Sequence, residues 1–571
     1  MQIEQESDPI REDTIFVHFP DNSVHSFPSG IHVSSIISAE KFPASKTPIV
    51  ACYINSELKQ MNFKVNTNVR SILPVHLDTP LGSDIYRKTL AFVLEMAFQK
   101  VEPNRRLEIG HSLGAAYFFE AKSQDESPLS IESLNKIDDE MKSIISSSFP
   151  IIKTQITWKD AILYFTSKNM SRSLSFVTQK NTAMISVSSC NQFVSLCHGI
   201  LLPNTNLLSR YELLKYGSEN GFLLRFPHTS TPSIIDPFVD QPKIFSTFVE
   251  SKKWGRTFNV SSVGDLNKLV LDNSVQKIRQ YILLCETLHD RKMVEIATAA
   301  TSNENCKLIL IAGPSSSGKT TFARKLCVHL RVLGKDPFCL SLDDFYNELE
   351  DCPKDASGEY DFESLEALDV KLINETLSDL IALKEVQIPV YNFKTNKKER
   401  GKIVQLKPNS IIVVEGIHGL NDRLTPMIPA EQKYKIFISA LTQLTLDELH
   451  RVPTTDNRLV RRMVRDYQFR GTSGEETILR WPAVRAGEEK HIFPFQNSAD
   501  IIFNSALDYE MCALRTIAEP LLRRLLPSSP VYLEAQRILS FVRCFEPLET
   551  SHIPINSILR EFIGGSSFAD G

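Results

Sequence analysis

The second half of the chain alternates short, continuous apolar runs with longer stretches of helical periodicity. The apolar runs are Leu308 to Ala312, Phe338 to Leu342, Ile411 to Val414, Ile436 to Ile438 and Ile501 to Phe503. Strands that are apolar at every position are buried on both faces, so the pattern predicts a parallel sheet with helices on both faces. Phe322, Leu326 and Leu330 follow helical spacing and predict one of these helices, which ends at Gly334.

The front half follows different patterns. Short alternating segments separated by turns predict a small β-rich module over the first 75 residues. Helical periodicity follows from Ile85 to Phe98, and four prolines between Pro227 and Lys243 predict a domain boundary. Apolar positions from Val275 to Leu288 predict a helix that bridges two halves, and the last 65 residues are expected to be helical.

Composition and charge describe an ordinary globular protein. At about 150 residues per domain, 571 residues suggest about four domains. A net charge of −4 offers no global attraction to nucleic acid or to an anionic membrane. The apolar runs are far shorter than a membrane helix, and the acidic residues 1–14 lack the apolar core of a secretory signal. We therefore expect a cytoplasmic protein without a membrane partner, and the ten cysteines, which form no Cys-x-x-Cys pair, are expected to be reduced.

The strongest motif is a phosphate-binding loop. Residues 313–320 read GPSSSGKT and match G-x-x-x-x-G-K-[ST] without a mismatch, between a predicted strand and a predicted helix. Glycines let backbone N–H groups surround phosphate oxygens, and the helix N-terminus adds its positive end. Lys319 is expected to clamp the β and γ phosphates, and the Thr320 hydroxyl to ligate Mg²⁺. The candidate ATP-binding residues are Gly313, Pro314, Ser315, Ser316, Ser317, Gly318, Lys319, Thr320 and Thr321.

Two further predicted strands lead into acidic residues at the sheet edge where open α/β folds hold their ligands. Asp343 follows one of them, and its carboxylate could accept the proton of an attacking hydroxyl; a turn or N-cap role is the alternative. Glu415 follows the other strand and could hold Mg²⁺ through water.

Arginines recur farther along at the spacing of one helical face. They are Arg458, Arg461, Arg462 and Arg465, with Arg470 just beyond. Four arginines on one face repel one another unless they meet an anion, so we expect a lid over the transferred phosphates. A solvated basic face is the alternative.

These motifs together resemble the uridine kinase and phosphoribulokinase family over about residues 307–506. The resemblance is carried by residues 313–321, by Asp343-Asp344-Phe345-Tyr346, by the segment IPVYNF at 388–393, by Glu415-Gly416 and by RRMVRD at 461–466. It implies an α/β P-loop kinase that uses ATP and Mg²⁺, with Asp343 as general base toward a nucleoside 5′-hydroxyl. The implied substrate residues also include Tyr346, Glu363, Tyr391 and Arg465, and Arg462, Arg465 and Arg470 would meet the phosphates. Thr320 and Glu415 would serve the Mg²⁺ ion.

The sequence departs from the family pattern at two positions and in one segment. Asn396 stands where uridine-specific members carry a histidine, and Thr472 replaces a lid arginine. Residues 362–369 keep acids, Glu363 among them, but alter the sugar-side contacts. The implied function is a uridine or cytidine kinase. A kinase of another hydroxylated metabolite, such as a sugar phosphate or a pantothenate-like acid, and a nucleotide-gated RNA-associated or regulatory protein stay open as alternatives.

The front half resembles the N-terminal region of threonyl-tRNA synthetases. Residues 13–75 are similar to the ubiquitin-like β-grasp TGS module through Phe19-Pro20-Asp21, and residues 79–226 to the synthetase's second additional domain, an α+β module. Two of the four ligands of that domain's editing site are replaced, because Ala115 follows His111 and Leu201 follows Cys197 at the ligand spacing. Since two ligands cannot make a zinc site, we expect neither editing activity nor bound zinc, and we interpret His198 as a surface or core histidine.

One further pattern in the front half is interpreted as a chance match. Residues 110–114 satisfy G-x-S-x-G, but the short, half-charged segment before them does not suit the nucleophile elbow of a serine hydrolase.

The predicted organisation is multidomain. We expect a TGS-like module at 1–78, a synthetase-like module at 79–243, a linker with the bridging helix at 244–304, the kinase at 305–506 and a helical extension at 507–571. The expected partner is a small-molecule nucleoside. RNA binding by the front half, which lacks a dense Lys/Arg run, and self-association stay open.

Overall fold

The computed structural model describes residues 14–39, 47–123, 125, 127–272, 274–354, 358, 360–392 and 395–568. Phe393 of the IPVYNF motif and the acidic residues 1–13 lie outside the described residues. The chain divides into two compact units. Unit 1 comprises Met1–Asp240, Ser262–Gly264 and Thr445–Arg451, and unit 2 comprises Gln241–Ser261, Asp265–Leu444 and Val452–Gly571.

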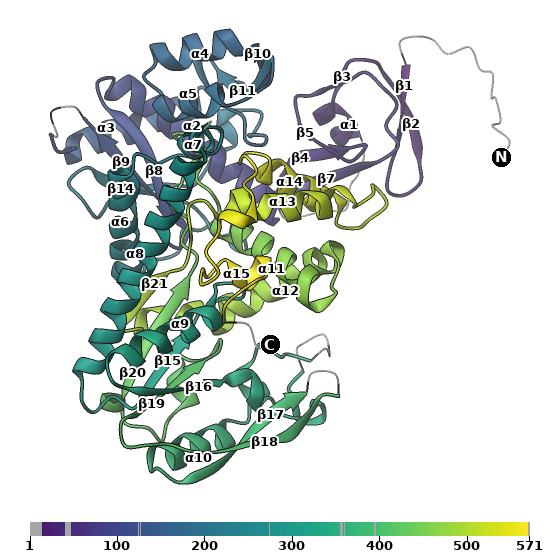
Figure 1. Cartoon of the computed structure of the whole chain (residues 1–571). Coiled ribbons are helices and arrows are strands. Elements are labelled where there is room, and N and C mark those ends of the chain that lie inside the picture. The colour runs from purple at the N-terminus through teal and green to yellow at the C-terminus, as the bar shows by residue number, and fades with distance from the viewer. Residues whose placement is uncertain are drawn as a thin grey trace. The chain divides into compact units, whose positions relative to one another are not determined.

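Unit 1 begins with a small α/β module (purple in Figure 1). Its elements are β1 (Thr14–His18), β2 (Val24–Pro28), β3 (Ile31–His32), α1 (Val33–Ala39), β4 (Ile49–Ile54), β5 (Glu57–Gln60), β6 (Lys64–Val65) and β7 (Ile72–His76). β4 lies between β5 and β7, and β1 pairs with β2. Ile15 and Val17 alternate with exposed residues, so one face of β1 packs on Ile36 of α1 in a shared core. The predicted β-rich module is present, with one helix packed on its strands.

The rest of unit 1 contains two antiparallel sheets. Their strand orders are β13-β14-β9-β8 and β10-β11-β12. The elements are α2 (Pro80–Val101), β8 (Arg106–Ser112), β9 (Ala116–Lys122), α3 (Ile131–Ser146), β10 (Ile152–Thr157), α4 (Trp158–Ser167), α5 (Ser171–Thr178), β11 (Met184–Cys190), β12 (Phe193–Leu196), β13 (Glu212–Lys215) and β14 (Gly221–Arg225). The predicted helix at 85–98 lies inside α2, which begins after the Thr79 N-cap.

The G-x-S-x-G pattern falls in a hairpin. β8 ends at Ser112, Gly114 has a φ of 57°, and β9 follows at once. A nucleophile elbow joins a strand to a helix, so this segment lacks the architecture of a hydrolase.

A short segment from the second half of the sequence completes unit 1. Thr445–Arg451 belongs to this unit although it lies in the chain between two elements of unit 2. The backbone carbonyl of Glu448 accepts a hydrogen bond from the N–H of Ile109 in β8 (3.0 Å), and Leu449 is buried in the main core of the unit.

Unit 2 is built on a five-stranded parallel sheet in the order β16-β19-β15-β20-β21. The strands are β15 (Leu308–Ala312), β16 (Asp336–Ser341), β19 (Ser410–Glu415), β20 (Lys433–Ser439) and β21 (Ile501–Asn504). Each coincides with one predicted apolar run. Ile309 and Ile311 pack with the helices on one face, and Leu308 and Leu310 with the helix on the other. The predicted sheet with helices on both faces is confirmed.

The helices of unit 2 surround this sheet and extend beyond it. They are α6 (Pro242–Thr257), α7 (Val263–Val270, whose first two residues fall in unit 1), α8 (Val275–Ser302), α9 (Lys319–Val332), α10 (Val370–Ile381), α11 (Thr454–Arg470), α12 (Gly474–His491), α13 (Glu510–Arg523), α14 (Tyr532–Val542) and α15 (Arg560–Ile563). A hairpin of β17 (Glu385–Asn392) and β18 (Lys397–Gln405) follows α10.

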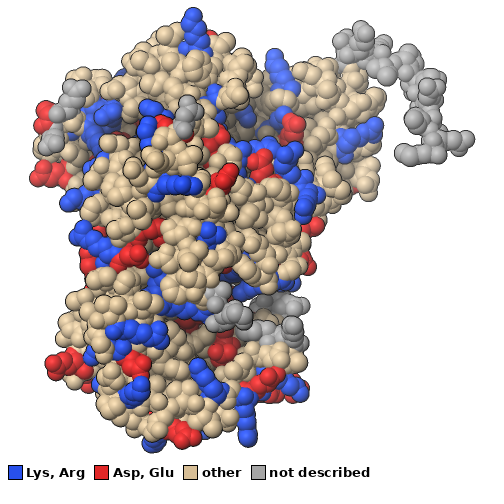
Figure 2. All heavy atoms as spheres, viewed as in Figure 1, with Lys and Arg blue, Asp and Glu red and all other residues tan. Residues whose placement is uncertain are grey.

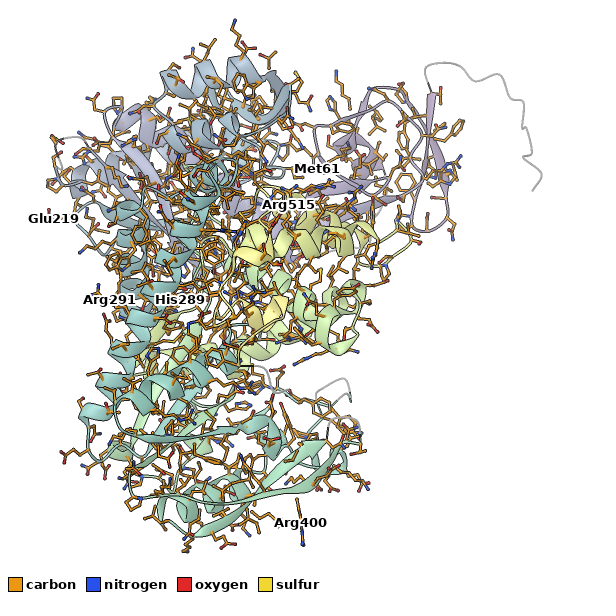
Figure 3. All side chains as sticks on the ribbon, in the orientation of Figure 1. Met61, Glu219, His289, Arg291, Arg400 and Arg515 are labelled. Atoms are coloured by element: carbon orange, nitrogen blue, oxygen red, sulfur yellow. The ribbon has the colours of Figure 1, made fainter. Side chains whose placement is uncertain are left out.

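Helix α8, predicted to bridge two halves, falls within unit 2. Its buried residues Met293 and Ile296 share a core with β15 and α9. His289 and Arg291 both lie on α8 (Figure 3), where His289 is buried and Arg291 interacts with Glu295 at the surface.

The surface carries charges of both signs. In the face shown in Figure 2, Lys and Arg are interspersed with Asp and Glu, in keeping with a net charge of −4. Among the described helices, none combines the length and the apolar composition needed to cross a lipid bilayer.

Candidate active site

The phosphate-binding loop connects β15 to α9 in unit 2, as the motif requires. Its glycines are needed for two different reasons. A Cβ on Gly313 would lie 2.1 Å from the carbonyl oxygen of Ile438, so β20 leaves no room for a side chain. Gly318 caps α9 with a φ of 88°, in the left-handed region that favours glycine. The loop is therefore fixed in a shape that leads directly into the N-terminus of a long helix.

Three adjacent strands, β15, β19 and β16, bring the predicted acids beside the loop. β19 lies between β15 and β16, and Glu415 is in register with both Ile311 and Ser341. The Thr320 hydroxyl at the start of α9 donates to a Glu415 carboxylate oxygen (3.1 Å), and the Ser341 hydroxyl lies 3.4 Å from the same oxygen. Asp343 follows β16 in a short 3₁₀ turn. These residues, which are far apart in the sequence, therefore meet at one edge of the sheet.

Burial and mutual charge shift the pKa values of this group. Burial and the nearby Asp343 raise the pKa of Glu415 to about 7, against the opposing effect of Lys319. Burial raises the pKa of Asp343, although its side chain reaches solvent and Lys319 favours its charged form. Burial lowers the pKa of Lys319, and the neighbouring Glu415 and Asp343 oppose that effect. The pKa values of both acids are thus raised above their usual range, a common property of catalytic groups.

The donors around Glu415 suit a magnesium ion. Mg²⁺ binds through oxygen, and this corner offers the hydroxyl of Thr320 and the carboxylate of Glu415 within 3.1 Å of each other. A divalent cation would also offset the repulsion between Glu415 and Asp343 that raises the Glu415 pKa. The residues predicted for Mg²⁺ therefore fit the ion.

Aromatic residues predicted for the nucleoside side lie next to one another. The rings of Tyr346 and Tyr391 are 5.7 Å apart, and the Tyr346 hydroxyl donates to the carbonyl oxygen of Phe362 (3.1 Å). Glu363 follows Phe362, and its half-buried carboxylate interacts with the charges of Arg462 and Lys319. Gly487 of α12 makes room for it, since a Cβ there would lie 2.9 Å from the Glu363 side chain. Two tyrosines and an acid thus lie near one another, and the acid is within the electrostatic reach of Lys319.

The prediction that four arginines of α11 form a lid is wrong for two of them. Arg458 and Arg461 are 1% and 0% exposed. Arg458 is paired with Glu488 of α12 and Arg461 with Glu510 of α13. Arg458 also donates to the carbonyl of Ser315 (3.0 Å), and Arg461 to that of Ser316 (3.3 Å). Buried protein carboxylates, not a phosphate, neutralise these two guanidinium groups.

The other predicted arginines keep positions near the phosphate-binding loop. Arg462 donates to the hydroxyl of Ser315 (2.8 Å), and Arg465 binds the Asp466 carboxylate (2.8 Å). Arg470 is exposed near the end of α11, 3.7 Å from Asp466. Asp466 therefore orients a group of three guanidiniums beside the loop.

A carboxylate that the sequence analysis missed also lies at this loop. Glu561 of the C-terminal helix α15 accepts a hydrogen bond from the backbone N–H of Thr321 (3.0 Å), in the first turn of α9. Its charge also acts on Lys319 and Glu415. Ile558 packs so closely on Gly318 that a Cβ there would lie 2.5 Å from it. No local pattern marks Glu561, because only the folded chain brings it to a loop some 240 positions earlier.

The residues at the four editing-site positions of the front half, of which only His111 and Cys197 are potential ligands, have different surroundings in the structure. His111 of β8 is buried, and burial lowers its pKa to about 3. Leu201 is buried in the core, and the Cys197 thiol contacts the carbonyl of Gly199.

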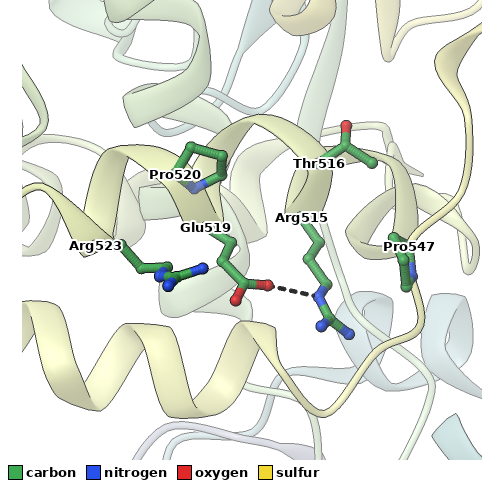
Figure 4. A pocket seen from close by; sticks show the side chains of 6 residues that line it. All are labelled: Arg515, Thr516, Glu519, Pro520, Arg523 and Pro547. Carbon is green, nitrogen blue, oxygen red and sulfur yellow. Dashed lines mark hydrogen bonds and ion pairs between the residues drawn. The ribbon is translucent and has the colours of Figure 1, made fainter.

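A shallow pocket elsewhere in unit 2 is separate from the loop. It lies on α13 and is lined by Arg515, Thr516, Glu519, Pro520, Arg523 and Pro547 (Figure 4). Arg515 donates to Glu519 one turn farther along α13 (2.9 Å), and Glu519 also accepts a hydrogen bond from Arg543 (2.9 Å).

Part of the sequence that forms this site matches a known protein family. Residues 308–511 match the family model described as Phosphoribulokinase / Uridine kinase family. The matched segment begins at β15 and ends within α13, so it includes the loop, the acids and the arginine helix.

Curated relatives fall into two groups. A uridine kinase of Ligilactobacillus salivarius is 29% identical over 203 residues, which are 35% of this chain and 86% of that protein. A uridine kinase of Saccharomyces cerevisiae is 31% identical over 206 residues, 35% of this chain and 37% of that protein. A threonine–tRNA ligase of Nitratidesulfovibrio vulgaris is 26% identical over 166 residues, 29% of this chain. The chain spans only about a quarter (26%) of the length of that ligase. Homologues of both kinds confirm the predicted fusion of a kinase domain to a synthetase-like front part.

Two solved structures are similar to this chain. A possible uridine kinase from Bacillus stearothermophilus is 20% identical, with a TM-score of 0.25, over 40% of this chain and 100% of that one. A putative fructose transport system kinase from Silicibacter is 14% identical, with a TM-score of 0.25, over 37% of this chain and 98% of that one.

Proposed function

We propose that this protein is an ATP- and Mg²⁺-dependent nucleoside kinase that transfers the γ-phosphate of ATP to the 5′-hydroxyl of uridine or cytidine. The observation that carries the proposal is the convergence of Lys319, Asp343 and Glu415 at the ends of three adjacent strands, inside a segment that matches the phosphoribulokinase and uridine kinase family. Uridine is the substrate in the names of two relatives, which supports the choice of nucleoside.

The proposed chemistry uses positioning and charge. Asp343 takes the proton of the attacking hydroxyl, a role that suits a carboxyl whose pKa is raised by burial. Lys319 and the backbone N–H groups at the start of α9 bind the phosphates, and Arg462 and Arg465 neutralise charge on the transferred group. Thr320 and Glu415 hold the Mg²⁺ ion, which supplies charge stabilisation at the phosphates when bound.

Substrate contacts are proposed for the other side of Asp343. Tyr346 and Tyr391 pack beside the nucleoside, because aromatic faces suit a planar base, and Glu363 accepts hydrogen bonds from the sugar hydroxyls. Asn396 has a φ of 54° and lies in the turn of the β17–β18 hairpin. It stands where a uridine-specific histidine is expected, so it favours relaxed base recognition or another hydroxylated substrate as the second candidate.

The test is a coupled ADP-release assay over nucleosides, sugar phosphates and pantothenate, with and without Mg²⁺. We expect turnover with uridine or cytidine that requires Mg²⁺, and a product phosphorylated at the 5′ position by NMR. Turnover with only a sugar phosphate or pantothenate would replace the proposed substrate and keep the kinase. Salt-dependent tRNA binding without turnover of any acceptor would favour the regulatory alternative.

A further inference from the structure

Two histidines and an aspartate meet in unit 1, away from the residues proposed for phosphoryl transfer. They are His198, Asp447 and His450, and one ligand atom from each lies within 4.8 Å of the others. The Nε2 atom of His198 is 3.1 Å from Oδ2 of Asp447, and Nδ1 of His450 is 2.9 Å from the same oxygen. The two imidazole rings are 4.9 Å apart. One carboxylate oxygen is therefore flanked by two imidazole nitrogens.

The fold fixes each of the three groups before any ligand is considered. His198 follows β12, its ring packs edge-on against Phe176 (5.2 Å), and its carbonyl accepts a hydrogen bond from Lys88 (3.1 Å). Asp447 Oδ1 accepts hydrogen bonds from the backbone N–H groups of Leu449 and His450, both at 2.8 Å. Rotation of the carboxylate is thus restricted, and Oδ2 stays directed at the histidines.

The loop that carries Asp447 and His450 is anchored on both sides. Leu449 is buried in the core of unit 1, and the Glu448 carboxylate accepts the backbone N–H of Arg172 (2.8 Å) at the start of α5. The N–H of Val263 donates to the carbonyl of Thr445 (2.9 Å). These contacts hold the three potential ligands in a fixed geometry, as a metal site requires.

We propose that His198, Asp447 and His450 bind one zinc ion, with water as the fourth ligand. Zinc favours imidazole nitrogen and carboxylate oxygen at about 2.0–2.2 Å, and ligands at tetrahedral angles are then separated by roughly 3.3 Å. The separations of 3.1 and 2.9 Å across the cluster are close to that value. The side chains of His198 and His450 are 13% and 10% exposed, so an ion can reach them from solvent. The Asp447 side chain is only 1% exposed, so its carboxylate has almost no contact with solvent.

This inference revises the expectation of a zinc-free front half. That expectation considered only the pairs at His111 and Cys197, and it left His198 without a ligand role. The new set draws its two other members from Thr445–Arg451, which lies along the chain between β20 and α11. A zinc ion here would cross-link the front half to the connection that leads into the arginine helix.

The test measures zinc binding by the full-length protein. The protein is stripped with a chelator, reloaded with one equivalent of zinc in excess Mg²⁺, desalted and analysed by mass spectrometry of the elements. We expect about one zinc per chain in the wild type, and affinity weakened more than tenfold in His198→Asn and His450→Asn. The exposed histidine His228, which contacts Ser230 in the same unit, provides the matched control His228→Asn and should bind as the wild type does.

Two further readouts separate ligand loss from misfolding. Cobalt in place of zinc should give the visible absorption of a tetrahedral site in the wild type and the control but not in the two variants. Zinc should raise the melting midpoints of the wild type and of His228→Asn but not those of His198→Asn and His450→Asn, while all four metal-free proteins melt alike. Absence of retained zinc, retention of iron or manganese in its place, or full zinc binding by His450→Asn would overturn the proposal. These readouts do not depend on kinase activity, so the proposal can fail while the proposed function stands.

Discussion

The pKa values of the ionisable residues at the loop depend more on their surroundings than on the residue type. The pKa values of Glu415 and Asp343 are both raised, because burial disfavours the charged form of each and the nearby Asp343 adds repulsion at Glu415. Lys319 experiences the opposite effect of burial, partly offset by these same acids. Lys319 and the two acids oppose the shifts that burial causes in one another, so a substitution at one of these residues alters the pKa values of the others.

Replacement of Asp343 tests the assignment of the base. Asp343→Asn removes the proton acceptor while keeping the shape, and we expect turnover to fall by about 10²–10⁴ with little change in the melting midpoint. Steady-state rates with the best acceptor measure this. Asp344→Asn is the matched control, since Asp344 is adjacent in the same turn, and it should keep most activity. Near-normal turnover of Asp343→Asn would remove the residue from the base role.

His289 of α8 links stability to pH. Burial lowers its pKa to about 3, and its Nε2 is 3.2 Å from the carbonyl oxygen of Ala506. In the unfolded chain a histidine titrates near pH 6.5, so between about pH 6.5 and 3 only the unfolded state binds the proton. Stability should therefore fall as pH falls below 6.5, by at most about 1.4 kcal/mol per pH unit from this residue.

The measurement compares melting midpoints of the wild type and His289→Gln between pH 7 and pH 5. The variant should lose less stability than the wild type over this interval, whatever its stability at pH 7. The exposed-residue variant His228→Gln should follow the wild type. Parallel pH profiles for all three proteins would contradict the role of His289.

At the scale of elements, α11 carries two kinds of arginine on one broad face. Arg458 and Arg461 lie inside the protein and tie the helix to α12, α13 and the carbonyls of the phosphate-binding loop. Arg462 and Arg465 are only partly buried and share Asp466. A single helix therefore both supports the loop and presents cations to it.

This division predicts opposite effects for neighbouring substitutions. Arg461→Met leaves Glu510 as an uncompensated buried charge, which should cost about 3–5 kcal/mol of stability. Arg465→Met should leave stability nearly unchanged and lower turnover instead, since it removes charge at the transferred phosphate. Thermal melts and steady-state rates on both variants measure the contrast. Equal loss of stability in the two would contradict it.

At the scale of the whole molecule, the last described helix reaches the phosphate-binding loop within unit 2. Ile558 packs on Gly318, and the Glu561 carboxylate accepts a hydrogen bond from the backbone N–H of Thr321 in the first turn of α9. That N–H belongs to the group that binds anions at a helix N-terminus. The C-terminal segment therefore places a negative charge where the nucleotide's own charges must bind.

Glu561→Gln should consequently bind ATP more tightly. Removal of the charge relieves repulsion with the phosphates while the side chain keeps its shape, so we expect KM for ATP to fall severalfold with kcat nearly unchanged. Initial rates across ATP concentrations give both constants. Glu549→Gln, a substitution in the same C-terminal region but away from α9, is the control. An increased KM for ATP in Glu561→Gln would mean that the carboxylate assists the nucleotide.

Local patterns were sufficient to predict much of unit 2 and the centre of its site. The five apolar runs are all strands, because a strand buried on both faces must be apolar at every position. The loop from Gly313 to Thr320 and the acids Asp343 and Glu415 were found because their chemistry depends on neighbours in sequence or on the ends of predicted strands. Their catalytic roles stay predictions for the experiments above.

Contacts between distant parts of the chain could not be predicted in this way. Helical spacing placed Arg458 and Arg461 on the same face as Arg462, but their burial depends on Glu488 and Glu510, which belong to other helices. Likewise, Glu561 meets α9 and Asp447 meets His198 only after folding. Periodicity and motif spacing report local geometry and the side of an element that is apolar. The partner of a buried charge is set by packing, and packing is a property of the folded chain alone.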